Sequence, residues 1–370
     1  MKNYILNCPS KTIILSIIAS GIGCFSCLPA MAAILTLPSS TEKVLLLDVD
    51  VSGSVNNDTE YGLIMGGYEN AFRNTDIQNS IIDYTDGTLG TDGITIGLQF
   101  WSSDRKMMTD TSGNKWFHLT DAVSINNFAD TIKNSSRPTK LSPDNIGGGT
   151  NLAGALVQSQ VELQALFNGG TVNYSFTEPR NGNTTTFTAT NNQGAISDGA
   201  NLETMIDIST DGFHDRQTSD GNGNTDCDDD GKGSDSPRSV EAGLSDLVNC
   251  QAVLADAISA VLTNGEADRI NALPILGETS RYRDLLGTYY QDGLTVTGGD
   301  IGGIVGVDAD AVNPAFVETA DSFNDFNRAI NAKLSREIQE VPFEFNPSLG
   351  LFLSGGWVLG LRYKKNKKLG

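Results

Sequence analysis

The sequence predicts an α/β protein with a doubly wound, mostly parallel sheet flanked by helices. Four runs, at residues 44–49, 93–100, 204–208 and 270–276, are apolar at nearly every position. Strands of a parallel sheet show this pattern because helices cover both of their faces. Segments with helical spacing separate the runs, and strands that alternate with helices are typical of a doubly wound sheet.

The predicted helices follow in chain order. Residues 58–72 come after the first strand, and 122–133 place apolar and polar residues at helical spacing. Residues 151–167 begin directly after a glycine-rich loop. The last two predicted helices are 240–262, with a break near Asn249, and 323–338.

A polar insertion interrupts this pattern at 168–201, which is rich in Asn, Thr and Gly. Residues 172–177 and 184–190 alternate as strands do, and the turn signal Asn181-Gly182-Asn183 separates them. This pattern predicts a β-hairpin. The hairpin either contacts a ligand or is a surface elaboration.

Oxygen-bearing side chains follow two of the predicted strands and precede one helix. Loops at the carboxyl ends of parallel strands line the ligand crevice of an open α/β sheet. Carboxylates and hydroxyls are hard ligands that suit Mg²⁺ or Mn²⁺. The candidate metal ligands are Asp50, Ser52, Ser54, Thr150 and Asp211.

These three loops, in this order, resemble the metal-ion-dependent adhesion site (MIDAS) of von Willebrand factor A (vWA) domains. The resemblance implies a Rossmann-like fold with a bound divalent cation. It also implies that Ser52, Ser54 and Thr150 contact the ion, while Asp50 and Asp211 lie close by, often through water. We expect an acidic side chain of an unknown protein partner to complete the coordination of the ion.

Within that superfamily, the chain is similar to the bacterial group DUF1194 of secreted, uncharacterised A-domain proteins. The matching phrases are 49–55, 60–61, 67–68, 71–73, 97–102, 289–292 and 321–338. The resemblance covers residues 43–340, with insertions at 168–201 and 215–236. Because that group has no established activity, the resemblance implies a fold and a metal site but no substrate.

The second insertion contains a run of alternating Asp, Asn and Gly residues. Short oxygen-bearing side chains with glycines between them are what calcium loops use. Pro237 stands where an EF-hand loop has its closing Glu, so we expect either a calcium loop of another type or a disordered acidic loop. The candidate Ca²⁺ ligands are Asp220, Asn222, Asn224, Asp226, Asp228 and Asp230.

Both termini carry targeting features. Residues 1–32 have the basic start, short apolar region and small-residue cleavage motif of a secretory signal peptide, although Cys24 and Cys27 leave a lipoprotein alternative open. Residues 342–370 begin Pro342-Phe343-Glu344 and end in a basic cluster, which resembles a PEP-CTERM-type sorting signal. A plain membrane anchor and a core helix are the alternatives. We therefore expect export to the envelope, cell surface or medium, with membrane contact through the C-terminal segment.

The charge balance argues against one class of partner, and the cysteine content allows a disulfide. The formal net charge is −20, from 45 acidic and 25 basic residues, which argues against nucleic acid because phosphate binding relies on Lys and Arg. Cys227 and Cys250 are the cysteines that remain after signal cleavage, and they can form a disulfide outside the cytoplasm.

No catalytic constellation is evident in the sequence. The two histidines are His118 and His214, and no nucleophile-elbow motif accompanies Ser52. We therefore expect an exported, metal-dependent adhesive or protein-binding domain rather than an enzyme. A metal-dependent hydrolase and a calcium-stabilised envelope structural protein are the alternatives.

Overall fold

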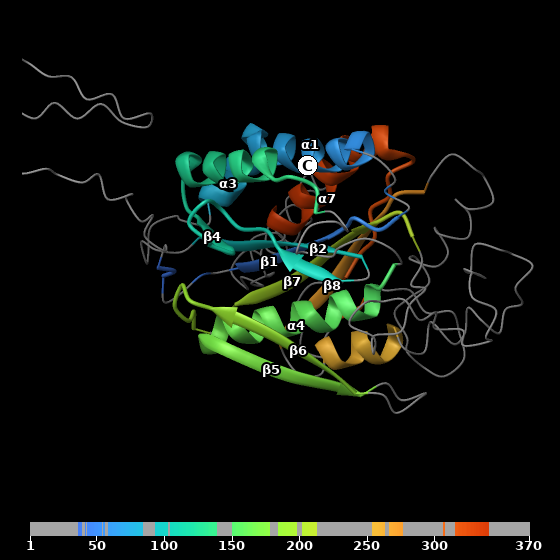
Figure 1. Ribbon diagram of the computed structural model, residues 1–370. Coiled ribbons are helices and arrows are strands. Elements are labelled where there is room, and N and C mark those ends of the chain that lie inside the picture. Colours follow the sequence, from blue (N-terminus) through green and yellow to red (C-terminus); the bar gives the residue numbers. More distant parts are fainter. Residues whose placement is uncertain are drawn as a thin grey trace, which may run out of the picture. The chain divides into compact units, whose positions relative to one another are not determined.

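The computed structural model describes residues 36–38, 41, 43–53, 55, 58–83, 93–102, 104–138, 150–177, 184–197, 202–212, 254–262, 266–276, 306–307 and 315–339. Its centre is a seven-stranded sheet with the order β3-β2-β1-β7-β8-β9, and β4 also pairs with β2 (Figure 1). The parallel strands are β1 (Lys43–Asp50), β2 (Ile94–Trp101), β7 (Glu203–Thr210) and β8 (Arg269–Pro274). This mostly parallel sheet confirms the predicted fold class.

The edges of the sheet are antiparallel. β3 (Arg105–Met107) and β4 (Trp116–Leu119) pair with β2, and the short β9 (Gly306–Val307) pairs with β8. From β1 the sheet grows through β2 to one side, whereas from β7 it grows through β8 to the other. The strand order therefore reverses between β1 and β7, and ligands of open α/β sheets bind at the carboxyl ends of the strands at such a point.

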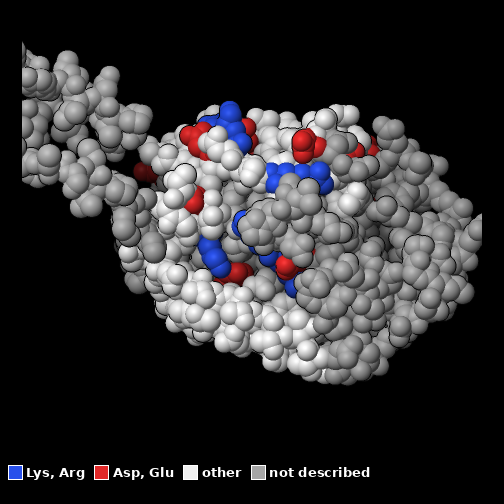
Figure 2. Space-filling view, in the orientation of Figure 1, with Lys and Arg blue, Asp and Glu red and all other residues white. Residues whose placement is uncertain are grey.

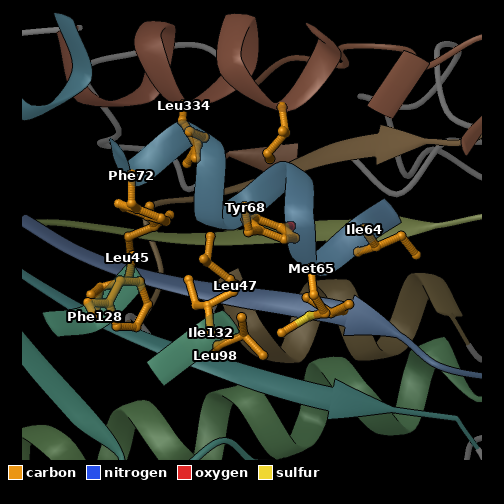
Figure 3. Packing of buried hydrophobic residues seen from close by; sticks show 14 of the residues in the cluster. Leu45, Leu47, Ile64, Met65, Tyr68, Phe72, Leu98, Phe128, Ile132 and Leu334 are labelled. Atoms are coloured by element: carbon orange, nitrogen blue, oxygen red, sulfur yellow. The ribbon is translucent and has the colours of Figure 1, made fainter. Parts of the chain in front are cut away.

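One face of the sheet is covered by α1 (Asp58–Arg73), α2 (Thr75–Asp83), α3 (Ala122–Asn134) and α7 (Phe326–Gln339), which the short helix η1 (Phe323–Asp325) precedes. Figure 3 shows Leu45 and Leu47 of β1 in the same apolar cluster as Tyr68, Phe72 and Leu334. Helices α1 and α7 approach closely at Gly67, where a Cβ would lie 2.6 Å from a ring carbon of Phe326. A larger residue there would force the two helices apart.

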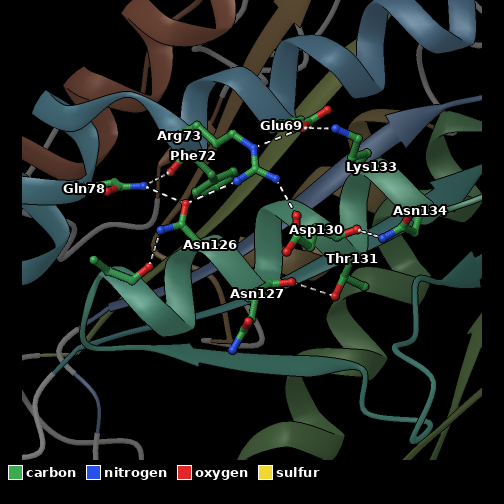
Figure 4. A network of polar contacts seen from close by, with 11 residues as sticks. Glu69, Phe72, Arg73, Gln78, Asn126, Asn127, Asp130, Thr131, Lys133 and Asn134 are labelled. Atoms are coloured by element: carbon green, nitrogen blue, oxygen red, sulfur yellow. Dashed lines mark hydrogen bonds and ion pairs between the residues drawn. The ribbon is translucent and has the colours of Figure 1, made fainter. Parts of the chain in front are cut away.

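Polar contacts join the outer sides of α1 and α3 (Figure 4). Arg73 donates to Glu69 at 3.0 Å and also pairs with Asp130, while Lys133 lies 3.2 Å from Glu69. Asp121 caps α3, accepting from the Ser124 N–H at 2.7 Å. Exposed ion pairs contribute about 0–1 kcal/mol each, so the apolar cluster dominates the packing of these helices.

The opposite face is covered by α4 (Leu152–Asn168) and by the helical segment 254–262. Nearly every residue of α4 is buried, because the hairpin of β5 (Gly170–Thr177) and β6 (Thr184–Asn191) packs on its outer side (Figure 1). Phe176 and Phe187 supply the apolar contacts of the hairpin. The hairpin predicted at 172–177 and 184–190 is therefore confirmed.

Charged groups lie buried on both faces of the sheet. Beneath α4, Asp48 accepts hydrogen bonds from Gln99 at 3.0 Å and Ser159 at 2.6 Å. Beneath α7, Lys333 lies 2.5 Å from Asp207 and 2.6 Å from Glu337, and all three are fully buried. The apolar runs of β1 and β7 thus each contain a carboxylate whose burial periodicity alone does not reveal.

Several elements differ from the prediction. The sequence pattern does not predict α2, β3, β4 or β9, which are short or polar. Of the helix predicted at 240–262, the structure describes the helical residues 254–262. The terminal segments 1–32 and 342–370 lie outside the described residues, and so do Cys227 and Cys250, so the targeting and disulfide predictions stay predictions. None of the described helices combines the length and hydrophobicity needed to cross a bilayer.

Candidate metal centre

Three segments meet at the carboxyl ends of β1 and β7. Asp50 ends β1, and Val51 directly after it donates its N–H to the Trp101 carbonyl of β2 at 2.8 Å. Asp211 follows the last residue of β7. Thr150 precedes Asn151, which caps α4 by accepting from the Gly154 N–H at 3.0 Å. The sheet therefore brings chain segments about 160 residues apart to its switch point.

The carboxylate of Asp50 is held by a donor on each oxygen. Oδ1 accepts from the Ser52 N–H at 2.7 Å, and Oδ2 accepts from the Thr210 hydroxyl at 2.6 Å. The side chain is fully buried. Since both bonds come from the loops that carry the other candidate ligands, the Asp50 carboxylate fixes the relative position of the ends of β1 and β7.

The hydroxyls of Ser52 and Thr150 lie side by side. Thr150 Oγ1 donates to Ser52 Oγ at 3.4 Å, and both residues are buried. Gly212 approaches Thr150 so closely that a Cβ at this position would lie 3.0 Å from Thr150 Oγ1. The absence of a side chain at Gly212 therefore lets the loop after β7 reach the threonine.

The negative charges of Asp50 and Asp211 repel one another in this centre. Burial, followed by the negative charge of Asp211, raises the pKa of Asp50 from 3.8 to about 7, although the hydrogen bonds from Thr210 and Ser52 oppose this shift. Two other carboxylates of the sheet have cationic partners, since Glu203 pairs with Arg269 and Asp207 pairs with Lys333, whereas the buried Asp48 accepts from the neutral Gln99 and Ser159. Among the described residues, no Lys, Arg or His forms an ion pair with Asp50.

This donor set fits a divalent cation. A cation at the centre would compensate the charge of Asp50 and Asp211, and the hydroxyls of Ser52 and Thr150 would add neutral oxygen ligands. The described residues contain no group of three or more His, Cys, Asp or Glu side chains that could hold a metal ion. A site with two carboxylates completed by hydroxyls has the composition of a hard-cation site, in contrast to a His- or Cys-rich zinc site.

Some predicted site residues lie outside the described part of the chain. They are Ser54 of the first loop, the glycines 147–149 and the six candidate calcium ligands between Asp220 and Asp230. His214 also lies outside it. The structure thus brings together Asp50, Ser52, Thr150 and Asp211.

Two further residues support the segments of the centre. Thr210 contacts Asp50 and accepts the Gly212 N–H at 3.0 Å, so it links the two carboxylate loops. Ser102 accepts the Asn151 N–H at 3.1 Å through its carbonyl, and its buried hydroxyl has no hydrogen-bond partner among the described atoms. Their signal in the sequence is a hydroxyl residue at the end of an apolar strand, which is too common to identify them.

The strand order and the helices on both faces define a doubly wound, Rossmann-like α/β fold, which agrees with the predicted resemblance to vWA domains. A family model described as "Protein of unknown function (DUF1194)" matches residues 40–168. The matched segment contains Asp50, Ser52 and Thr150 and ends before Asp211. No curated protein matches the chain.

Several solved structures are similar at low sequence identity. Proximal thread matrix protein 1 from the mussel byssus is 11% identical with a TM-score of 0.40, over 82% of this chain and 49% of that protein. The PilB minor pilin from Streptococcus sanguinis is 12% identical with a TM-score of 0.39, over 82% of this chain and 63% of the pilin. A von Willebrand factor type A protein from Catenulispora acidiphila is 11% identical with a TM-score of 0.37, over 80% and 43%.

The chain therefore spans about half the length of the mussel protein. One structure of that mussel protein is described with a zinc-occupied MIDAS motif. At these TM-scores the fold assignment rests on the strand order and parallel register of this chain itself.

Proposed function

We propose that this protein is an exported binding protein that recognises an acidic side chain of a protein partner through a divalent cation. The observation that carries the proposal is the buried pair Asp50 and Asp211, with the hydroxyls of Ser52 and Thr150 beside it. Mg²⁺ or Mn²⁺ is the cation that these hard oxygen ligands favour. When bound, the ion supplies an electrophilic position for one carboxylate of the partner.

The hydroxyl ligands and the carboxylates would have different roles at the ion. Ser52 and Thr150 are neutral, so they leave more of the positive charge of the ion uncompensated than carboxylate ligands would. Asp50 is fixed by Ser52 and Thr210, and fixed groups lose less entropy when they bind an ion. The centre therefore favours one additional anionic ligand over a fully satisfied, closed site.

The position of His118 removes one candidate general base for the alternative hydrolase. This residue lies on β4 opposite Thr95, with Nδ1 3.2 Å from the Thr95 hydroxyl. Thr95 is near the start of β2, whereas the metal centre is at its carboxyl end, about 20 Å away at about 3.3 Å per residue. His118 is therefore too distant to act as a general base at the centre.

Export rests on the predicted signal peptide at 1–32, and membrane contact rests on the predicted sorting segment at 342–370. An acidic surface suits a soluble exported domain and disfavours nucleic acid. Reduced export of a reporter fused to residues 1–32 on mutation of the Ala30-Met31-Ala32 motif would support this part of the proposal. Unchanged export and processing would contradict it.

Water-proton relaxation with Mn²⁺ as the probe tests the binding role. We expect Mn²⁺ bound to the full-length chain to show high relaxivity, because water exchanges at the open position. Adding glutamate or acetate should lower the relaxivity as a carboxylate displaces that water, and EDTA should abolish the signal. Relaxivity that is unaffected by carboxylates would contradict an open position, while hydrolysis of ester or phosphate substrates that depends on Asp50 would establish the hydrolase instead.

A further inference from the structure

The hairpin β5–β6 carries no charged residue in either of its eight-residue strands. Its exposed face is a double row of small polar side chains that bond across the strands: Thr171 with Thr190 at 2.9 Å, Ser175 with Thr186 at 3.3 Å and Thr177 with Thr184 at 2.8 Å. In Figure 2 the lower part of the described surface, where Figure 1 places the hairpin, shows neither Lys or Arg nor Asp or Glu. The hairpin strands are therefore uncharged in a chain with a net charge of −20.

The two edges of the hairpin differ. β6 lies against α4, and its Thr188 carbonyl accepts a hydrogen bond from the Gln158 amide at 3.1 Å. In the described part of the chain, no third strand lies beside β5. Within the described residues, β5 is therefore the open edge of this two-stranded sheet.

β5 also lacks the features that normally protect an edge strand. Natural proteins block exposed edges with Lys, Pro, β-bulges or very short strands. β5 has eight residues without Lys or Pro, and its register with β6 is continuous from Gly170 opposite Asn191 to Thr177 opposite Thr184. A long, regular and uncharged edge is a template for pairing with another strand.

The inner face of β5 is incompletely covered. Phe176 is 5% exposed, whereas Val172 and Tyr174 are only partly buried against α4. A strand added beside β5 would cover these two side chains further. Burial of these apolar side chains would therefore favour pairing at the edge where the free backbone groups of an edge strand form hydrogen bonds with an added strand.

We propose that β5 pairs with β5 of a second copy of this chain, in antiparallel register about a two-fold axis at Tyr174. In an antiparallel pair, residues directly opposite one another lie on the same face of the sheet. This register places Thr171 opposite Thr177, and Asn173 opposite Ser175, of the second copy on the polar face. On the inner face it places Val172 opposite Phe176.

The composition of the edge argues for a second copy over a different partner. The strand is nearly self-complementary in polarity, as the isologous contact of a two-fold dimer requires. The high negative charge opposes contact between copies elsewhere on the surface, but not along the uncharged β5. The resulting four-stranded sheet would give the assembly two metal centres, so that a weak ligand could be bound bivalently.

Sedimentation equilibrium of the full-length chain tests this inference. We expect a reversible monomer–dimer equilibrium that shifts toward the dimer at higher ionic strength, because salt screens the repulsion between two acidic chains. Amide hydrogen exchange in β5 should slow as the protein concentration rises. A chain that stays monomeric at all concentrations, or an association that weakens with salt, would overturn the inference.

A matched pair of variants locates the contact. Asn173→Lys with Ser175→Lys places lysines at the open edge, where they oppose the same lysines of the second copy, and should weaken dimerisation about tenfold or more. Thr188→Lys with Thr186→Lys makes the same charge change at the positions directly opposite on β6, and should leave most of the dimerisation intact. Equal loss in both variants, or no loss in the first, would contradict pairing through β5. Mn²⁺ binding should be unchanged in both variants, so failure of this inference is distinguishable from failure of the proposed metal function.

Discussion

At the scale of the residue, the properties of the centre depend most on Asp50, because its surroundings disfavour its negative charge. Burial and Asp211 raise its pKa to about 7, so a proton would compete with a bound cation for this carboxylate near neutral pH. Thr210 and Ser52 hold the carboxylate in place with two short hydrogen bonds. A side chain that is buried, fixed and without a cationic partner among the described residues suits the binding of a cation.

The first prediction concerns pH. Because the folded-state pKa of Asp50 is about 7 and the ordinary value is 3.8, its protonated form stabilises the metal-free fold at low pH, and this contribution is lost as pH rises through about 7. The increase in melting temperature on adding Mg²⁺ should therefore be larger at pH 8 than at pH 5.5. Thermal unfolding at both pH values, with and without Mg²⁺, measures this effect. A Mg²⁺ effect that is independent of pH, or one that persists in Asp50→Asn, would contradict the assignment.

The second prediction concerns Thr210. Thr210→Val keeps the shape of the side chain but removes the hydrogen bond to Asp50, and loss of such a supporting contact typically costs about 10–100-fold in metal affinity. Titration of Mn²⁺ measures the change. Thr95→Val is the matched control. Thr95 is a buried strand threonine that contacts His118 of β4, and it lies near the start of β2, at the opposite end of this strand from the metal centre. Equal affinity in Thr210→Val and the wild-type chain would remove Thr210 from the centre.

At the scale of the element, α7 is attached to the sheet by buried charge as well as by apolar packing. Lys333 lies between Asp207 of β7 and Glu337 one turn further along α7, and Asn271 of β8 donates to Glu337 at 2.8 Å. Breaking a buried ion pair is costly because it leaves a charge without compensation. The orientation of α7 is therefore specified by a polar contact inside an apolar cluster.

The third prediction follows from that contact. Lys333→Met should lower the free energy of unfolding by about 3–5 kcal/mol. The loss should be larger at pH 8 than at pH 5.5, because burial raises the pKa of Asp207 to about 7 and its protonation at the lower pH relieves the uncompensated charge. Arg328→Met is the control on the same helix, where the arginine is 58% exposed and pairs with Asp325 and Glu318. Its cost should stay below about 1 kcal/mol. Urea unfolding measures both, and equal losses would contradict a buried role for Lys333.

The sequence predicts the strands of the centre better than it predicts their surroundings. Asp50 and Asp211 could be placed together because the carboxyl ends of parallel strands share one edge. The contact of Thr210 with Asp50 depends on the register of β7 beside β1, which periodicity does not specify. Lys333 sits in a segment that reads as an ordinary amphipathic helix, and only its packing against Asp207 explains its burial. Helix α2 is too polar to be recognised by hydrophobic periodicity.

At the scale of the whole molecule, an acidic chain can bind cations at more than one place. The Asp- and Asn-rich run from Asp220 to Asp230 follows Asp211 in the sequence, so a calcium ion there would lie near the metal centre along the chain. The two sites differ in chemistry, since the run offers many carboxylates and the centre offers two with hydroxyls. We therefore expect Ca²⁺ to prefer the Asp- and Asn-rich run and Mg²⁺ to prefer the metal centre.

The fourth prediction is a second class of calcium sites. Titration of Ca²⁺ into the metal-free chain should show binding that Asp226→Ala with Asp228→Ala removes, while Mg²⁺ binding in that variant stays unchanged. Asp50→Asn should show the opposite pattern. If the double variant keeps its calcium affinity and its resistance to proteolysis in Ca²⁺, the run is an acidic loop without a site.

The measurement that tests the account most directly is calorimetric titration of Mg²⁺ and Mn²⁺ into the metal-stripped full-length chain. We expect saturable binding of one ion per chain, lost in Asp50→Asn and retained in Asp48→Asn. Asp48 is the matched control because it lies two residues earlier on β1, is equally buried, and bonds instead to Gln99 and Ser159 beneath α4. No saturable binding in the wild-type chain, or equal binding in Asp50→Asn, would contradict the presence of a metal centre at the ends of β1 and β7.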